Sequence, residues 1–210
     1  MSIRICAAVV AVVVAGCSTP PTPTVVPPSL AELDQRAKAA LAPREAFDAL
    51  GGRFERDTPA ADSDQGEEGE TVANVCNSTK PLFVDRGTSI ARSRGWVGGV
   101  PLYERVHAMS VLDGEVLVGE VRRQADRCTQ QLPLGFLLAN LPIVKPEGVA
   151  DLYAYCQKSY EPDSPWWSCH AFLARDQLLA EVVVSSDHQD LAVSQLTSVV
   201  PIAAGPLVKA

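Results

Sequence analysis

The chain has 210 residues with 18 basic and 25 acidic side chains, a net charge of −7 at neutral pH. Such an acidic chain is a poor partner for nucleic acid or for an anionic surface, because both repel it. No segment approaches the roughly 20 consecutive apolar residues of a transmembrane helix, which argues against a helical membrane-spanning protein.

Residues 1–16 predict a secretory signal peptide. Arg4 supplies the positive charge, and residues 5–15 form an apolar stretch that is too short to cross a bilayer. The sequence Val-Ala-Gly-Cys at 14–17 resembles the lipobox of bacterial lipoproteins. This resemblance implies cleavage before Cys17, lipidation of Cys17, and a location on the outer side of the cell membrane. An ordinary secretory signal ending in small residues is the alternative.

Residues 17–28 predict an extended tether between the lipidated cysteine and the folded part. Residues 18–28 contain five prolines and have no apolar periodicity. Such a stretch favours polyproline II, which rises about 3.1 Å per residue. Residues 29–210 are then long enough for one domain with its own core.

The domain begins with a helical pattern. Ser29 and the carboxylate three residues later predict a capped helix that runs to about Leu41, and a second helical segment from Pro43 to Leu50. An acidic loop follows at residues 57–70, because charge dominates there and apolar periodicity is absent.

Two strands and a helix come next. Residues 88–97 and 102–111 alternate as two strands joined by a Gly-Gly turn. Asp113 can cap a helix whose apolar positions recur every three or four residues. These positions are Leu117, Val121, Ala125 and Cys128.

The last third predicts three strands and a closing helix. After a proline-punctuated segment at 133–149, strands are expected near 150–158, 166–174 and 177–185. A helix then starts at Asp187 or Asp190, and Pro201 kinks or ends it. Strands and helices do not alternate regularly, so the fold class is α+β: an antiparallel sheet of about five strands with helices mainly on one face.

Four cysteines remain in the folded part, namely Cys76, Cys128, Cys156 and Cys169. An even number in an exported chain predicts two disulfides, for which three connectivities are available. Cys156 and Cys169 flank a turn-forming segment and should face each other across a hairpin, which leaves Cys76 with Cys128.

No metal site or cofactor is expected. The four cysteines lack the paired Cys-x-x-Cys units of a zinc site. Asp62-x-Asp64-x-Gly66 is weakly similar to a calcium loop, but Ala73 stands where the closing glutamate would be.

Three segments carry a resemblance to a known family: "RRQADRC" at 122–128, "WWSCHAFLARDQLLAEVVV" at 166–184 and "DHQDLAVSQL" at 187–196. Their order resembles the PknH-like extracellular sensor domain of actinobacterial kinases and lipoproteins, over roughly residues 40–204. The resemblance implies an antiparallel sheet with packed helices and a cleft for an unknown ligand. It supplies no catalytic residues.

The histidines do not predict an enzyme. They are His107, His170 and His188, and no metal-binding spacing, nucleophile elbow or phosphate loop accompanies them. We therefore expect a protein that is not an enzyme.

A cluster of aromatic side chains is the candidate ligand site. If Cys156 and Cys169 lie on the helix-covered face, strand alternation sends five ring-bearing residues to the opposite face. These are Tyr153, Tyr155, Trp166, His170 and Phe172. The alternative is that the 133–149 segment covers them as a second core.

Two functions remain from these observations. The first is a membrane-anchored, extracytoplasmic lipoprotein with a non-catalytic sensor or ligand-binding domain that takes a small apolar ligand. The second is a structural or accessory lipoprotein that docks onto an envelope protein complex. A cavity under the aromatic residues would favour the first, and an open apolar patch the second.

Overall fold

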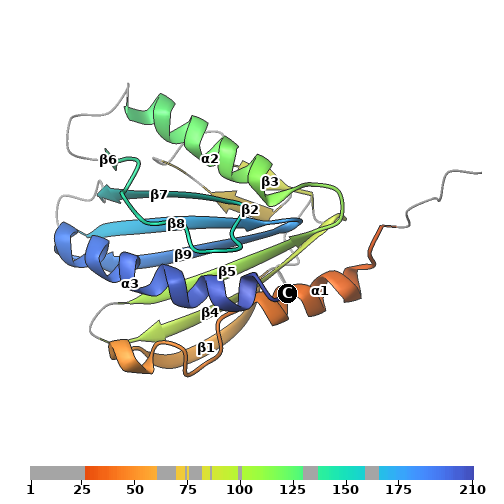
Figure 1. The fold of residues 1–210 in the computed structure, drawn as a ribbon, viewed down its shortest axis with the longest axis horizontal. Helices are drawn as coiled ribbons and strands as arrows, with labels where there is room; N and C mark the ends of the chain where they lie inside the picture. Colours follow the sequence, from red (N-terminus) through yellow and green to blue (C-terminus); the bar gives the residue numbers. More distant parts are fainter. Residues whose placement is uncertain are drawn as a thin grey trace, which may run out of the picture.

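The computed structural model describes residues 27–60, 70–73, 75, 82–85, 87–98, 101–129, 137–158 and 166–210. Figure 1 shows a seven-stranded antiparallel sheet, with the strand order β1-β4-β5-β9-β8-β7-β6, and a separate two-stranded sheet. The strands are β1 (Arg53–Ala60), β2 (Glu70–Ala73), β3 (Leu82–Val84), β4 (Ser89–Val97), β5 (Leu102–Met109), β6 (Leu137–Leu138), β7 (Asp151–Lys158), β8 (Trp167–Arg175) and β9 (Leu178–Ser186). The helices are α1 (Leu30–Ala40), the short 3₁₀ helix η1 (Asp48–Leu50), α2 (Gly114–Thr129) and α3 (Gln189–Leu207).

The α+β class is confirmed, and the sheet is larger than predicted. The five expected strands are β4, β5, β7, β8 and β9, and the sheet gains β1 and β6 at its edges. Residues 57–60, expected in an acidic loop, belong to β1, while residues 61–69 lie outside the described residues. Arg, Glu and Asp side chains interrupt the alternation of β1, as is common for an edge strand, so its sequence resembles a loop.

The predicted helix start at Ser29 is confirmed. The Ser29 hydroxyl accepts a hydrogen bond from the Glu32 amide at 3.3 Å, and the Glu32 carboxylate accepts one from the Ser29 amide at 2.7 Å. The helix expected after Pro43 is reduced to η1, which ends at Gly51 in the left-handed conformation with φ of 77°. Glycine, which has no Cβ, adopts that conformation at the lowest steric cost.

The helices cover both faces of the sheet. Helices α1 and α3 lie on one face, and α2 lies on the other with the small β2–β3 sheet (Figure 1). We call these the α1/α3 face and the α2 face. No described helix is long and apolar enough to cross a membrane.

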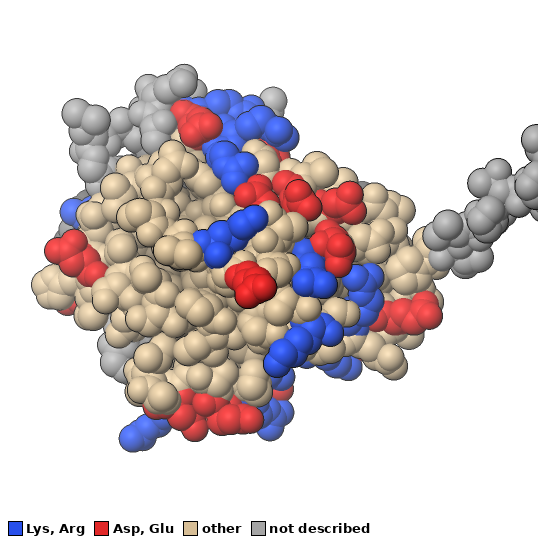
Figure 2. Space-filling view, viewed as in Figure 1, with Lys and Arg blue, Asp and Glu red and all other residues tan. Residues whose placement is uncertain are grey.

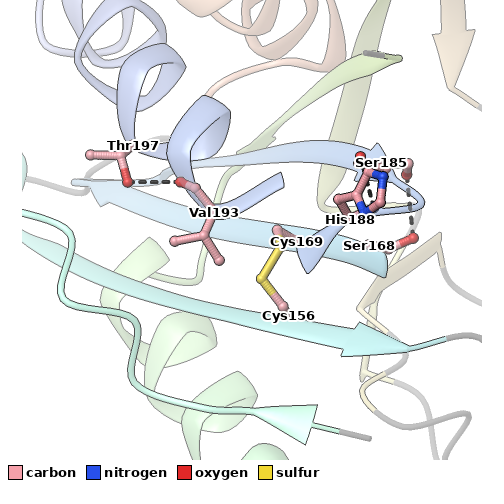
Figure 3. Close-up of a disulfide and its surroundings, with 8 residues drawn as sticks. Cys156, Ser168, Cys169, Ser185, His188, Val193 and Thr197 are labelled. Carbon is pink, nitrogen blue, oxygen red and sulfur yellow. Dashed lines mark hydrogen bonds between the residues drawn. A yellow bond between two sulfur atoms is a disulfide. The ribbon is translucent and has the colours of Figure 1, made fainter. Parts of the chain in front are cut away.

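The disulfide predicted across the hairpin is confirmed. Cys156 of β7 pairs directly with Cys169 of β8, and their Cα atoms are 3.9 Å apart. The disulfide lies on the α1/α3 face near Val193 of α3 (Figure 3). Cys128 is also disulfide-bonded. Its predicted partner Cys76 lies outside the described residues, so that pairing stays a prediction.

The last helix continues through Pro201, which was expected to kink or end it. Helix α3 runs to Leu207 and contains both Pro201 and Pro206. Each proline removes one backbone donor. The buried side chains on either side of Pro201, including Val199, Val200 and Ala203, hold the helix against the sheet.

Candidate functional site

Four of the five predicted aromatic residues form one group on the α2 face. Tyr153 and Tyr155 come from β7, and His170 and Phe172 come from β8; we call these four the aromatic row. The Tyr155 and His170 rings stack with centroids 4.9 Å apart, and the Tyr155 and Phe172 centroids are 6.2 Å apart. The fifth residue, Trp166, precedes β8 and is 45% exposed.

Helix α2 covers the aromatic row. Tyr155 and Phe172 are only 1% and 0% exposed, and they belong to one core cluster with Val118 and Val121 of α2. The segment 133–149 was the alternative cover: of its described residues, Leu137 packs beside this cluster, while residues 133–136 lie outside the described residues. Burial is the main reason why the pKa of the Tyr155 hydroxyl lies well above its ordinary value.

His170 is held by a carboxylate from the neighbouring strand. Its Nδ1 lies 3.0 Å from Oε1 of Glu181 on β9, and the two side chains are 14% and 10% exposed. A carboxylate only accepts hydrogen bonds, so Nδ1 is the donor of this contact, and in the neutral imidazole Nε2 is the acceptor. Among the described residues, Nε2 is buried and has no hydrogen-bond partner.

A cation lies on the other side of Glu181. Arg105 of β5 pairs with Glu181 in the strand register. The Arg105 guanidinium donates to the Tyr103 hydroxyl and to the Thr71 carbonyl, both at 3.2 Å. Glu181 thus lies between the guanidinium-bearing Arg105 on β5 and the imidazole of His170 on β8, and its contact with Nδ1 keeps the His170 ring oriented.

Hydroxyl groups lie one row further along the same face. Ser168 of β8 and Ser185 of β9 form a hydrogen bond of 3.3 Å between their Oγ atoms (Figure 3). Both are half-buried, as is Gln157 opposite Ser168 on β7. This row supplies neutral donors and acceptors beside the buried His170 acceptor.

Two further buried ionisable groups lie on β5. Glu104 is fully buried on the α1/α3 face, where its Oε2 accepts a hydrogen bond of 2.9 Å from the Ala42 amide. Burial raises the pKa of the Glu104 carboxyl to about 8. His107 points to the opposite face, and burial lowers its pKa to about 3. Both groups are therefore uncharged at neutral pH.

The described residues contain no group of three or more His, Cys, Asp or Glu side chains that could hold a metal ion. The arrangement around His170 suits recognition of a hydrogen-bond donor. The sequence analysis did not select Glu181 or Arg105. A signal was present, because Glu181 is the only charged residue in the apolar strand Leu-Leu-Ala-Glu-Val-Val-Val-Ser-Ser.

The fold has a distant structural neighbour. The chain is similar to the crystal structure of the extracellular domain of PknH from Mycobacterium tuberculosis, with a TM-score of 0.47 and 11% sequence identity, over 88% of this chain and 97% of that chain. A similarity at this level carries no conclusion about function. No protein-family profile matches the chain, and no curated protein sequence matches it.

Proposed function

We propose that this chain is a lipid-anchored, extracytoplasmic domain that binds a ligand without transforming it, and that the ligand contacts His170. The observation that carries this proposal is the Nε2 atom of His170, which has no hydrogen-bond partner in the described part of the chain and which Glu181 holds in one orientation. Leaving a buried acceptor without a donor costs about 1–3 kcal/mol. A ligand with a hydroxyl or amide donor recovers that free energy on binding.

The ligand reaches His170 from the side of Ser168 and Ser185. Side chains on that part of the α2 face are half-buried, whereas Tyr155 and Phe172 lie fully under α2. The ligand therefore combines a donor for Nε2 with an apolar body that lies against the edge of the aromatic row. The covered aromatic row offers no open patch for docking an envelope protein, which favours ligand binding over the accessory function.

The extracytoplasmic location is supported by two observations. Cys156 and Cys169 form a buried disulfide between β7 and β8, and structural disulfides persist in oxidising compartments. The Val-Ala-Gly-Cys sequence at 14–17 supplies the expected lipidation site at Cys17.

Native mass spectrometry of the chain purified from the membranes of its own host tests both the lipid anchor and the ligand site. We expect an acylated peptide that begins at Cys17 and a co-purified small molecule on the folded domain. His170→Phe should lose that molecule, because phenylalanine keeps the ring stack but has no acceptor at the Nε2 position.

His188→Phe is the matched control, since the His188 side chain is 78% exposed at the start of α3. It should retain the bound molecule. An unmodified Cys17 would refute the anchor. A parent chain without any bound molecule, or an equal amount on His170→Phe, would refute the binding site.

A further inference from the structure

The outer surface of α3 is nearly free of charge. The helix has 19 residues, and Asp190 is the only charged one, in a chain whose net charge is −7. Figure 2 looks onto this side of the molecule and shows an uncharged area over most of α3, with Lys, Arg, Asp and Glu gathered mainly around it. The exposed residues of the helix after Leu191 are small or uncharged: Ser194, Thr197, Ser198 and Pro201.

Apolar side chains are exposed at one end of this surface. Leu191 of α3 is 41% exposed, and Leu50, at the end of η1, is 45% exposed. Between η1 and α3 lies a small depression, and Leu50, Gln195 and Val199 are among the residues that line it. We call the outer side of α3 together with Leu50 the α3 surface.

The chain enters the fold on this same side. Helix α1 begins at Leu30, lies on the α1/α3 face and contacts α3 (Figure 1). The ten residues that follow Cys17, up to Pro27, would span about 31 Å in a polyproline II conformation. A lipid on Cys17 would therefore hold the α1/α3 face within a few tens of ångströms of the bilayer.

From these observations we infer that the α3 surface rests on the membrane to which Cys17 attaches the chain. This inference depends on the lipid anchor of the proposed function. Beyond Asp190 at its first turn, the α3 helix can approach a bilayer without desolvating charges of its own and without adding repulsion from anionic headgroups. Leu50 and Leu191 then lie against the interface and lose contact with water.

The outer side of α2 has the opposite character. Glu120 forms ion pairs with Arg123 and Arg127 at the surface of that helix, and the two arginine side chains are 63% and 66% exposed. Contact with a bilayer would remove water from these charges. Tethering supplies an effective concentration on the order of millimolar, so even a weak preference for the α3 surface orients the domain. The His170 site, on the α2 face, then points away from the membrane.

Site-directed fluorescence of the acylated full chain in vesicles of phosphatidylcholine and phosphatidylglycerol tests the orientation. A polarity-sensitive nitrobenzoxadiazole label is attached at Ser198→Cys on α3 or, in a separate protein, at Arg123→Cys on α2. We expect the emission to shift to shorter wavelength on vesicles at position 198 and to stay unchanged at position 123. The acylated Cys17 and the disulfide-bonded cysteines do not react with the label.

A second change tests the surface itself. Leu191→Glu, combined with the label at 198, should abolish the shift, whereas Val116→Glu should leave it intact because Val116 is an exposed aliphatic residue of α2. Equal shifts at 198 and 123, or no shift at 198, would overturn the inference. A shift at 198 that rises with the number of chains per vesicle would also overturn it, because a second copy would then cover α3.

Flotation of the same vesicles separates the two proposals. Chains that do not float with the lipid refute the anchor, and the inference falls with it. Chains that float but show no shift at 198 refute only the orientation.

Discussion

The α1/α3 face and the α2 face of the sheet are made by the same strands, yet their chemistry differs. On β7 and β8, the residues that point to α3 include Ala154, Cys156, Cys169 and Ala171, while the residues between them supply the aromatic row. Where β7 and β8 meet α3, the α1/α3 face is a core of mainly small and aliphatic side chains with a disulfide. The α2 face combines stacked rings with the charged side chains of Glu181 and Arg105.

The two faces therefore have different roles: the α1/α3 face stabilises the strands, and the α2 face carries the groups suited to recognition. Aliphatic side chains and a disulfide offer a ligand little that is specific, but they hold β7, β8 and β9 in register. That rigid register places His170 and Glu181 at hydrogen-bonding distance on the other face. The site is therefore on strands whose positions the opposite face determines.

The largest expected effect comes from removing a ring of the aromatic row. Phe172 is 0% exposed, so Phe172→Ala should leave a cavity under α2 and lower the free energy of unfolding by about 3–5 kcal/mol. Urea unfolding at pH 7 measures the loss. Trp166→Ala is the control, because Trp166 is 45% exposed and should cost about 1 kcal/mol or less. An equal decrease in the free energy of unfolding for the two variants would mean that α2 does not bury the aromatic row.

The disulfide should contribute a similar amount from the α1/α3 face. Cys156 and Cys169 are separated by 13 positions, and closing a loop of that size contributes about 3 kcal/mol. The double change Cys156→Ala and Cys169→Ala should therefore lower the urea midpoint strongly. Ser168→Ala with Ser185→Ala alters the other face of the same strands and should cost only about 1 kcal/mol. If both double variants lose the same free energy of unfolding, the α1/α3 face does not stabilise these strands more than the α2 face does.

Glu104 should make stability depend on pH. Its folded pKa of about 8 lies above the ordinary value of 4.5, so its stabilising contribution is complete below pH 4.5 and falls as the pH rises through 8. The slope is about 1.4 kcal/mol per pH unit, or about 2 kcal/mol between pH 5.5 and 7. The glutamine in Glu104→Gln cannot ionise. Between pH 5.5 and 7, the free energy of unfolding of this variant should therefore rise by about 2 kcal/mol relative to that of the parent.

Denaturant unfolding at several pH values measures this difference. Glu55→Gln on the exposed side of β1 is the control and should follow the parent at every pH. His107, on the α2 face of β5, acts in the opposite direction: its lowered pKa makes stability fall as the pH drops below 6.5. If the difference in free energy of unfolding between Glu104→Gln and the parent does not change with pH, the buried carboxyl is not neutral.

Much of the sheet could be predicted because strand alternation is a local pattern. The period of two placed Cys156, Cys169 and Ala171 on one face and Tyr155 and Phe172 on the other, as the structure shows. The same rule failed for β1, whose exposed edge position tolerates charges. The helix predicted from Pro43 to Leu50 was also too long: only η1 forms there, and Phe47 is buried against Trp96 with ring centroids 4.7 Å apart.

The sequence by itself determined the strand faces, the capped first helix and the pairing of Cys156 with Cys169, because each depends on neighbours in the chain or across one hairpin. Only the tertiary structure decided that α2 covers the aromatic row, that Glu181 meets His170, and that α3 presents an uncharged surface. These features depend on which elements, far apart in the sequence, pack together in the fold. Hydrophobic patterning requires that a face be buried but does not specify which element buries it.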